Sequence, residues 1–367
     1  DQAMYAYEQL LKEPEATVPL RTASLLTLAQ LNLVKERWDK GIDLILQWMD
    51  EVETVTAQSY YLLASAYFQK TDYVRARSNM EEAIRLAEEE GYRPKENWYV
   101  LLAACFSELK DKKIISAQFA LEQQVGIYEI LVNYYPKKMY FLQLGGTYQQ
   151  MDREEDYMLT LKAAFDKDLL DKEGEYLALA QLLLIKKNPY WAAQVLVAGQ
   201  DKKVTIKDED TGEEEIVAVV KDKEKTLKLL ADAWRMAQEI DMAIPVLEKA
   251  AKMSKDGDTY VLLGNLYLFE DRMEDSIRAI EAGLKKPKVK SRSQALLVLG
   301  QAHFELQNFE EAKKQFRAAA RDENKRIKKT ANSWIKYAEN EEIRVKNLAL
   351  RRDFIQQSKA KSKEKNS

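Results

Sequence analysis

The chain has 367 residues, of which 46% are hydrophobic and 32% are charged, with only 12 Gly and 7 Pro. This composition supplies a large apolar core and little flexible linker. The formal net charge of −3 gives no general attraction to nucleic acid, so nucleic acid is not an expected partner. The sequence has no uninterrupted run of about 18 apolar residues, so no membrane span is predicted.

The first predicted element is a helix within residues 1–21. Ala3, Tyr7 and Leu10 have the spacing of one helical face, as in the second helix of a helix pair. We therefore expect residues 1–21 to hold the second helix of a truncated N-terminal repeat. The chain begins at Asp1, without an initiator Met, which is expected of a trimmed or processed chain and leaves the cellular compartment open.

A pattern with a period of about 34 residues then returns eight times between residues 22 and 330. Each copy has an aromatic residue or Leu, then a Leu, a small residue and a bulky residue, followed by a second helix with Ala, a bulky residue and Ala. One copy reads Tyr60, Leu63, Ala64, Tyr67, Ala76, Met80 and Ala83. Apolar residues three and four apart make one stripe on each helix, and the small residue lets the two helices approach closely. Because one pair cannot bury its stripe alone, neighbouring pairs are expected to stack.

This pattern resembles the tetratricopeptide repeat (TPR) family over residues 22–330. The resemblance implies an all-α fold, a right-handed α-α superhelix (TPR solenoid), whose function is protein–protein interaction. Two intervals between equivalent repeat starts are longer than the others, from 96 to 138 and from 173 to 224. We interpret the first as an expanded unit, 96–137, with a lengthened second helix within 114–134. The second indicates an insertion at 202–223.

The insertion changes the character of the sequence. Two runs rich in β-branched residues flank a turn cluster of Asp, Glu, Thr and Gly, which predicts a short β-hairpin; a disordered acidic loop is the alternative. An isolated two-stranded hairpin is only marginally stable in water, so an ordered one needs a packing surface or a partner strand. Its free edge would suit an extended peptide. The candidate partner-binding residues are Val204, Ile206, Ile216 and Val217.

The main candidate binding surface follows from the TPR resemblance, which implies that the first helix of every pair lines a concave groove. Amide and small side chains at groove positions can bind peptide backbone, and the interleaved aromatic and apolar side chains can act as anchors. For each residue the alternative is that it only completes the packing between repeats. The predicted groove residues are Gln30, Tyr61, Ser65, Phe68, Leu142, Gln149, Gln181, Asn265, Phe269, Gln301 and Phe304.

Residues with catalytic potential are scarce. The single His303 occupies the bulky fourth position of its repeat, and the single Cys105 has apolar neighbours; both are expected to be packing residues. With both residues at packing positions no Cys/His dyad is expected, and one His and one Cys are too few for a Cys/His zinc cluster. The LGGT sequence at 144–147 lies within a repeat helix and not in a phosphate-binding loop. We therefore predict a non-enzymatic protein without metal or cofactor.

The C-terminal end is predicted to differ from the repeats. Residues 331–353 have a helical pattern with Trp334 and Tyr337, and we expect them to form a helix that caps the open end of the core. Residues 354–367 are rich in Gln, Ser and Lys. A basic tail of this kind can contact anionic lipid or nucleic acid, but its composition favours a disordered, solvated segment.

A second and closer resemblance covers most of the chain. The segments that carry it are KENWY (95–99), ILV (130–132), YPKK (135–138), LGGTY (144–148), AIPVLEKAA (243–251) and ANSWIKYAE (331–339). In these segments the sequence is similar to the TPR proteins encoded with TonB energy-transduction systems in Gram-negative bacteria. The resemblance implies a periplasmic accessory protein of TonB-dependent uptake, without catalysis, whose partners are TonB, its motor proteins or a TonB-dependent receptor. A cytoplasmic assembly or regulatory adaptor unrelated to TonB is the alternative.

Overall fold

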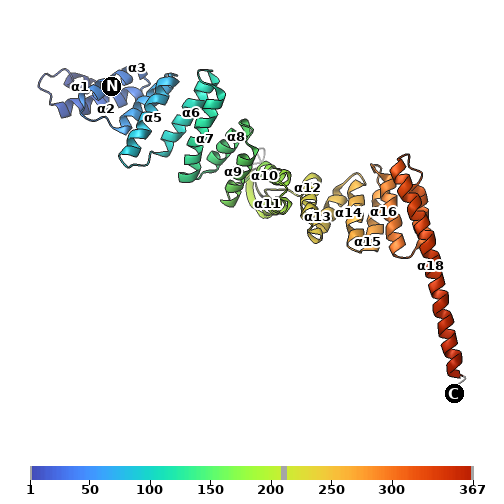
Figure 1. Ribbon diagram of the computed structural model, residues 1–367. Helices are drawn as coiled ribbons and strands as arrows, with labels where there is room; N and C mark the ends of the chain where they lie inside the picture. The colour runs from blue at the N-terminus through green and yellow to red at the C-terminus, as the bar shows by residue number, and fades with distance from the viewer. Residues whose placement is uncertain (1, 208–212, 365–367) are drawn as a thin grey trace. The chain divides into compact units, whose positions relative to one another are not determined.

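The computed structural model describes residues 2–207 and 213–364. The chain divides into two compact units, Asp1–Leu170 and Asp171–Ser367, and Figure 1 labels most of the helices of both. Residues 22–330 are predicted to form a single array, whereas the structure divides this stretch between Leu170 and Asp171. We describe each unit by itself.

The first unit consists of one leading helix and four antiparallel helix pairs. The leading helix packs on the first helix of the first pair. The first pair begins at Val18, four residues before the predicted repeat start. The helices are α1 (Gln2–Leu10), α2 (Val18–Val34) with α3 (Trp38–Glu51), α4 (Ala57–Gln69) with α5 (Tyr73–Glu89), α6 (Glu96–Asp111) with α7 (Ala117–Tyr134), and α8 (Lys138–Gln150) with α9 (Glu154–Asp166).

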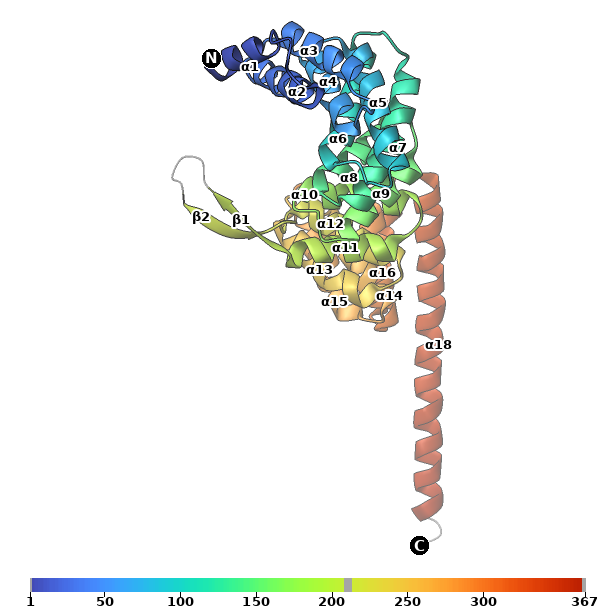
Figure 2. The ribbon, with the colours of Figure 1, turned by 90° about the vertical axis from the view of Figure 1, so that its left-hand side faces the viewer.

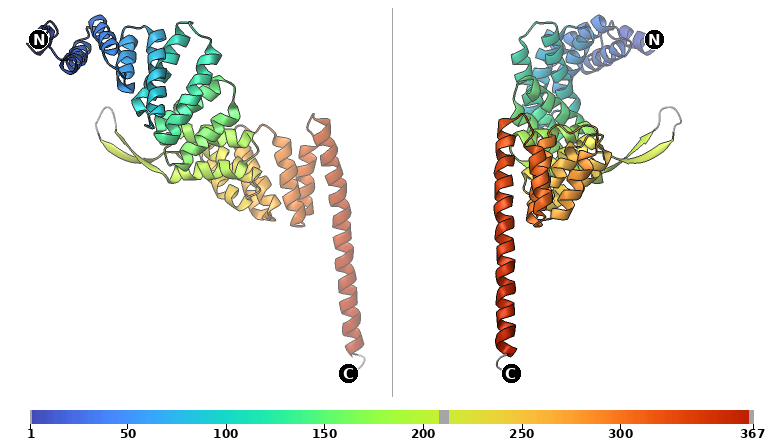
Figure 3. Two further views of the ribbon diagram at one scale, coloured as in Figure 1. Left: turned by 60° about the vertical axis from the view of Figure 1, so that its left-hand side comes forward. Right: turned by 90° about the vertical axis from the view of Figure 1, so that its right-hand side faces the viewer.

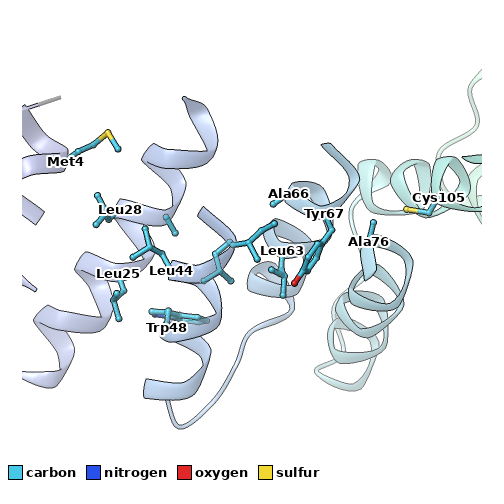
Figure 4. Close-up of a cluster of buried hydrophobic side chains, with 13 residues drawn as sticks. Met4, Leu25, Leu28, Leu44, Trp48, Leu63, Ala66, Tyr67, Ala76 and Cys105 are labelled. Atoms are coloured by element: carbon cyan, nitrogen blue, oxygen red, sulfur yellow. The ribbon is translucent and has the colours of Figure 1, made fainter. Parts of the chain in front are cut away.

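The core of the first unit runs through successive helix pairs. Figure 4 shows part of it, with Met4 of α1, Leu25 of α2, Trp48 of α3 and Leu63 of α4. All four side chains are buried and belong to one cluster, which extends as far as Cys105 of α6. Each helix therefore buries its apolar stripe against the next pair, which is the arrangement that a helical repeat requires.

The third pair, which is predicted to be expanded, has two long helices. Helix α7 has 18 residues and begins after Ser116, whose hydroxyl accepts a hydrogen bond from the Phe119 backbone N–H. Helix α6 has 16 residues, whereas α4 has 13. Helices α2 and α5 have 17 residues each, so long helices are not confined to this pair.

The second unit consists of four helix pairs, a β-hairpin and one long terminal helix. The hairpin connects the first pair to the second. The elements are α10 (Glu173–Ile185) with α11 (Pro189–Asp201), β1 (Lys203–Lys207), β2 (Glu214–Ala218), α12 (Glu224–Met236) with α13 (Ile240–Met253), α14 (Asp258–Phe269) with α15 (Met273–Leu284), α16 (Arg292–Glu305) with α17 (Phe309–Ala319), and α18 (Lys325–Glu364). The predicted all-α repeat fold with one short hairpin is therefore confirmed.

The turn between the two helices of a pair has the same backbone conformation in all eight pairs. At each turn one residue other than Gly has a positive φ, between 54° and 63°. Such a left-handed residue ends the first helix and lets the chain reverse into the second. Asp168, which lies between two pairs, has a φ of 57° as well, so this geometry is common to the eight turns but is not confined to them. The eight turn residues are Glu36, Thr71, Lys113, Asp152, Lys187, Gln238, Asp271 and Gln307.

Small residues in the first helices have the predicted role. A Cβ atom at Gly264 of α14 would lie 2.5 Å from the side chain of Ile280 in α15. One at Gly300 of α16 would lie 2.4 Å from the ring of Phe316 in α17. Both partner side chains are fully buried. The second helix of each of these pairs therefore occupies the space that a larger residue would need.

Helix α18 corrects the prediction for the C-terminal end. It begins at Lys325, six residues before the predicted cap, and continues to Glu364, so residues 354–364 are helical where a disordered tail is predicted. Figure 3 shows α18 extending well beyond α16 and α17. The segment contains no Gly or Pro, and its Gln, Lys and Ala residues have high helix propensity, which accounts for the helix without tertiary packing.

Candidate functional site

The predicted groove residues all lie on first helices of the pairs. In the first unit they are on α2, α4 and α8, and in the second unit on α10, α14 and α16. Several are open to solvent, and Leu142 and Phe269 are 36% and 75% exposed. The exposed members of the set are Gln30, Leu142, Gln149, Gln181 and Phe269.

Three predicted groove residues are engaged within the protein. The ring of Tyr61 stacks on Trp98 with centroids 5.4 Å apart, and its hydroxyl accepts a hydrogen bond of 2.7 Å from Asn97 Nδ2. The Ser65 hydroxyl donates to the Tyr61 carbonyl oxygen, and Asn265 Nδ2 donates to the Val261 carbonyl oxygen. For Asn265 this leaves the second N–H and the side-chain oxygen, so its amide can still both donate and accept.

Two predicted aromatic anchors are packed against other rings. Phe68, which is partly exposed, makes an edge contact with Tyr73 at 5.1 Å. Phe304 is only 9% exposed, and its ring contacts Trp334 and Tyr337 of α18. The repeat phase places Phe304 on the groove, but α18 packs over this position, so the structure does not offer Phe304 to a partner. Gln301, one turn earlier, remains partly exposed.

The second unit contains a cleft that includes two of the predicted residues. It has a volume of about 670 Å³ and lies between the α12–α13 turn and the C-terminal half of α14. Its apolar lining comes from Ile240, Leu262 and Leu266, with the exposed ring of Phe269 at the rim. Asn265 contributes its side-chain oxygen. An apolar recess with an aromatic rim and one amide acceptor is suited to hold a side chain of an extended peptide.

Charged side chains surround this cleft. Arg235, Glu239, Asp241 and Glu270 line it. These residues were not predicted, because only the groove positions of first helices were considered. Glu239 lies in the α12–α13 turn and Asp241 at the start of α13. In a repeat array each such turn lies beside the first helix of the next pair, and this rule could have located both residues.

The predicted hairpin is ordered in the structure. Strands β1 and β2 pair antiparallel, with Val204 opposite Val217 and Thr205 opposite Ile216. Figure 2 shows the hairpin extending away from the helices of the second unit. Ile216 is 71% exposed and lies on the opposite face of the hairpin from Val204. The four predicted contact residues therefore do not form one patch.

The base of the hairpin is tied to the helices. The Val219 backbone N–H donates to the Lys202 carbonyl oxygen, and the Val220 N–H donates to the Gly199 carbonyl oxygen, both at 2.9 Å. Val220 is fully buried, and its side chain fills the space that a Cβ atom at Gly199 would need. These contacts fix the root of the hairpin on α11, whereas the predicted turn at 208–212 lies outside the described residues.

The residues with catalytic potential are packed in the structure. Cys105 is fully buried, and burial raises the pKa of its thiol to about 12, so it is expected to stay protonated. Desolvation lowers the pKa of His303 below its ordinary value, and its buried Nδ1 has no hydrogen-bond partner. Among the described residues, no group of three or more His, Cys, Asp or Glu is arranged to hold a metal ion.

None of the helices in residues 2–207 and 213–364 combines the length and the apolar composition that crossing a bilayer requires.

Two stretches of the chain match models of the tetratricopeptide repeat. Residues 57–90 correspond to α4 and α5, and residues 261–325 extend from α14 to the beginning of α18. These two stretches are similar to the tetratricopeptide repeat. The second match includes Leu262, Asn265, Leu266 and Phe269, so one side of the cleft lies within a stretch that matches the repeat.

Several solved structures are similar to the chain. YrrB, described as a TPR protein with an unusual peptide-binding site, is 11% identical over 56% of this chain and 96% of its own, with a TM-score of 0.41. MamA is 19% identical over 52% and 94%, with a TM-score of 0.39. The TPR2AB domain of yeast Sti1 in complex with pHSP90 is 11% identical over 87% and 98%, with a TM-score of 0.30. These TM-scores are low, so the repeat assignment rests on the sequence pattern and the helix pairs. A comparison with curated protein sequences finds no match.

Proposed function

We propose that this protein is a non-enzymatic scaffold that binds an extended peptide or a partner subunit on the first helices of its tetratricopeptide repeats. The observation that carries the proposal is the cleft beside α14. Phe269 is 75% exposed at the rim of a recess of about 670 Å³ that is lined by Leu262 and Leu266. An exposed aromatic side chain next to a partly apolar recess is a common feature of interaction hot spots.

The partner that we propose is a component of a TonB-dependent uptake system, and the compartment is the periplasm. The sequence resemblance to TonB-associated TPR proteins supports both proposals. In this role the scaffold holds a segment of TonB, of its motor proteins or of a receptor, and catalyses no reaction. The competing assignment is a cytoplasmic adaptor unrelated to TonB. The two assignments predict different bound partners, a TonB-system component in the first case and a cytoplasmic protein in the second.

Site-specific photocrosslinking in cells tests the proposal. A photoreactive amino acid replaces Phe269 in the full-length gene product, and a control protein carries it at Leu159 of α9, which is also exposed, at 53%. We expect position 269 to crosslink a TonB-system component, identified by mass spectrometry, and position 159 to give no such product. A cytoplasmic protein at position 269 would support the adaptor instead. Absence of any specific product at position 269 would refute the cleft as the binding site.

The hairpin is a second candidate contact. Among the described residues the sheet has only the two strands β1 and β2, so each strand has an outer edge that an extended segment can pair with. Ile216 adds an apolar side chain that is 71% exposed. Ile216→Asp leaves the buried base of the hairpin intact. If, in a pull-down without the photoreactive residue, Ile216→Asp loses the partner identified by crosslinking while Phe269→Ala retains it, the hairpin and not the cleft is the binding site.

A further inference from the structure

The cleft beside α14 has an uncompensated negative charge at its rim. Three carboxylates line it, those of Glu239, Asp241 and Glu270. Glu239 and Asp241 are exposed and Glu270 is partly exposed, and none of the three forms an ion pair with a described Lys or Arg. The rim therefore has acceptor groups that only water satisfies in the free protein.

The one cation of the cleft is already neutralised. The Arg235 guanidinium donates to Asp232 Oδ1 from Nη2 at 3.1 Å and from Nε at 3.4 Å. Arg235 and Asp232 therefore cancel each other's charge, and the three carboxylates determine the sign of the local potential.

An equivalent junction two repeat pairs further along is different. There the α16–α17 turn faces α18 across a recess of about 460 Å³, which is also lined by carboxylates. At that junction Lys313 contacts both Glu310 and Glu342 at 2.7 and 2.6 Å, and Lys346 contacts Glu342 at 2.7 Å. Lys313 of α17 thus pairs with the acidic group at the start of its own helix and with one on the cap helix. At the α14 junction no described residue does so.

We propose that the α14 cleft binds a short extended peptide segment in which a bulky apolar side chain stands next to Lys or Arg. This inference rests on the proposed scaffold function and specifies the chemistry of its ligand. The apolar side chain occupies the recess formed by Leu262 and Leu266 beside Phe269. The cation interacts with the rim carboxylates, and the side-chain oxygen of Asn265 accepts a hydrogen bond from the peptide backbone.

The binding test uses four fluorescein-labelled octapeptides and the full chain. The first has a central Leu flanked by Lys on both sides. In the second and third, Glu or Ser replaces the flanking Lys, and in the fourth, Ser replaces the central Leu. We expect the Leu-Lys peptide to bind about tenfold tighter than the Leu-Glu peptide, which corresponds to ~1.4 kcal/mol. This preference should decrease when the salt concentration is raised, because the rim is exposed.

Two sets of variants locate the charge effect. Glu239→Gln, Asp241→Asn and Glu270→Gln together remove the rim charge. The matched control changes Glu274, Glu281 and Glu323 to Gln; these are exposed carboxylates of the same unit that do not line the cleft. We expect the rim variant to abolish the preference for the Leu-Lys peptide and the control to keep it. Phe269→Ala should weaken the binding of all three Leu-containing peptides.

The outcomes separate the ligand chemistry from the scaffold function. If the Leu-Ser peptide binds as tightly as the Leu-Lys peptide and Phe269→Ala abolishes both, the cleft binds peptides but the proposed role of the cation is wrong. A preference that persists in the rim variant refutes the role of the rim carboxylates. If none of the four peptides binds and position 269 crosslinks no partner in cells, the proposed function itself fails.

Discussion

Replacing Trp334 by alanine tests whether α18 is an integral cap of the second unit. The indole ring stacks on Phe316 of α17 at 5.5 Å between centroids and contacts Phe304 of α16 at 5.6 Å. It also contacts Tyr337 on its own helix at 5.7 Å. Trp334→Ala removes all three contacts, two of which join α18 to the last helix pair.

The expected loss can be worked out from burial. Truncating a fully buried aromatic side chain to alanine costs about 3–5 kcal/mol. Trp334 is partly buried, so we expect the lower end, about 3 kcal/mol, including the aromatic pair contributions. Phe354 is the matched control because it is an aromatic residue on the same helix but is 73% exposed. Phe354→Ala should change the free energy of unfolding by less than about 0.5 kcal/mol.

Urea denaturation followed by circular dichroism measures the loss, and hydrogen exchange locates it. In Trp334→Ala we expect faster amide exchange in α17 and in the first turns of α18, while α10 and α11 remain unchanged. A local effect is expected because the units of a repeat array contact mainly their neighbours. Equal losses for Trp334→Ala and Phe354→Ala, or a loss below about 1 kcal/mol for Trp334→Ala, would contradict the packing argument.

Three further predictions concern single positions. Hydrogen bonds from Lys313 and Lys346 hold the pKa of Glu342 at about 2, below its ordinary value in the unfolded chain, so its stabilising contribution is complete above about pH 4.5. This contribution should be lost as the pH falls toward 2, and wild-type and Glu342→Gln denaturation curves should converge there. Gly264→Ala should lower the free energy of unfolding by about 1–3 kcal/mol through overpacking. Gly146→Ala should raise it by up to about 1 kcal/mol, because the space around its Cβ position is open and Ala favours a helix more than Gly does; thermal denaturation measures both changes. Cys105 should react with a thiol reagent only on unfolding, and rapid labelling of the native protein would contradict its burial.

The sequence predicts the elements that depend on apolar periodicity. Leu63 and Met80 mark the stripes of a helix pair, and both are buried in the structure. Gly300 is predicted to be a close-approach position, and the ring of Phe316 fills the space beside it. The hairpin is predicted from two β-branched runs around a turn, and its strands form as expected. In each case the signal is local, since it depends on residues within one helix pair or one turn.

The features that were not predicted depend on contacts between elements. Phe304 has the phase of a groove residue, but its exposure depends on where α18 packs, which the repeat pattern does not specify. Glu239 immediately precedes α13 and Asp241 lies in its first turn. Their carboxylates line the cleft because the α12–α13 turn lies beside α14 of the next pair. The division of the array between α9 and α10 likewise has no signature in the repeat pattern.

Partner specificity in this array is therefore expected to depend on the turns more than on the helix stripes. The apolar and small positions are constrained by packing, as the buried neighbours of Gly264 and Gly300 show. The turn residues have a constrained backbone but exposed side chains, so their charge can vary at little cost in stability. Two equivalent junctions already differ in this respect, since Lys313 neutralises the one beside α18 and no described residue neutralises the one beside α14. If the binding test supports the cationic ligand, exchanging charges at the α12–α13 turn should change which peptide binds while the helix pairs remain folded.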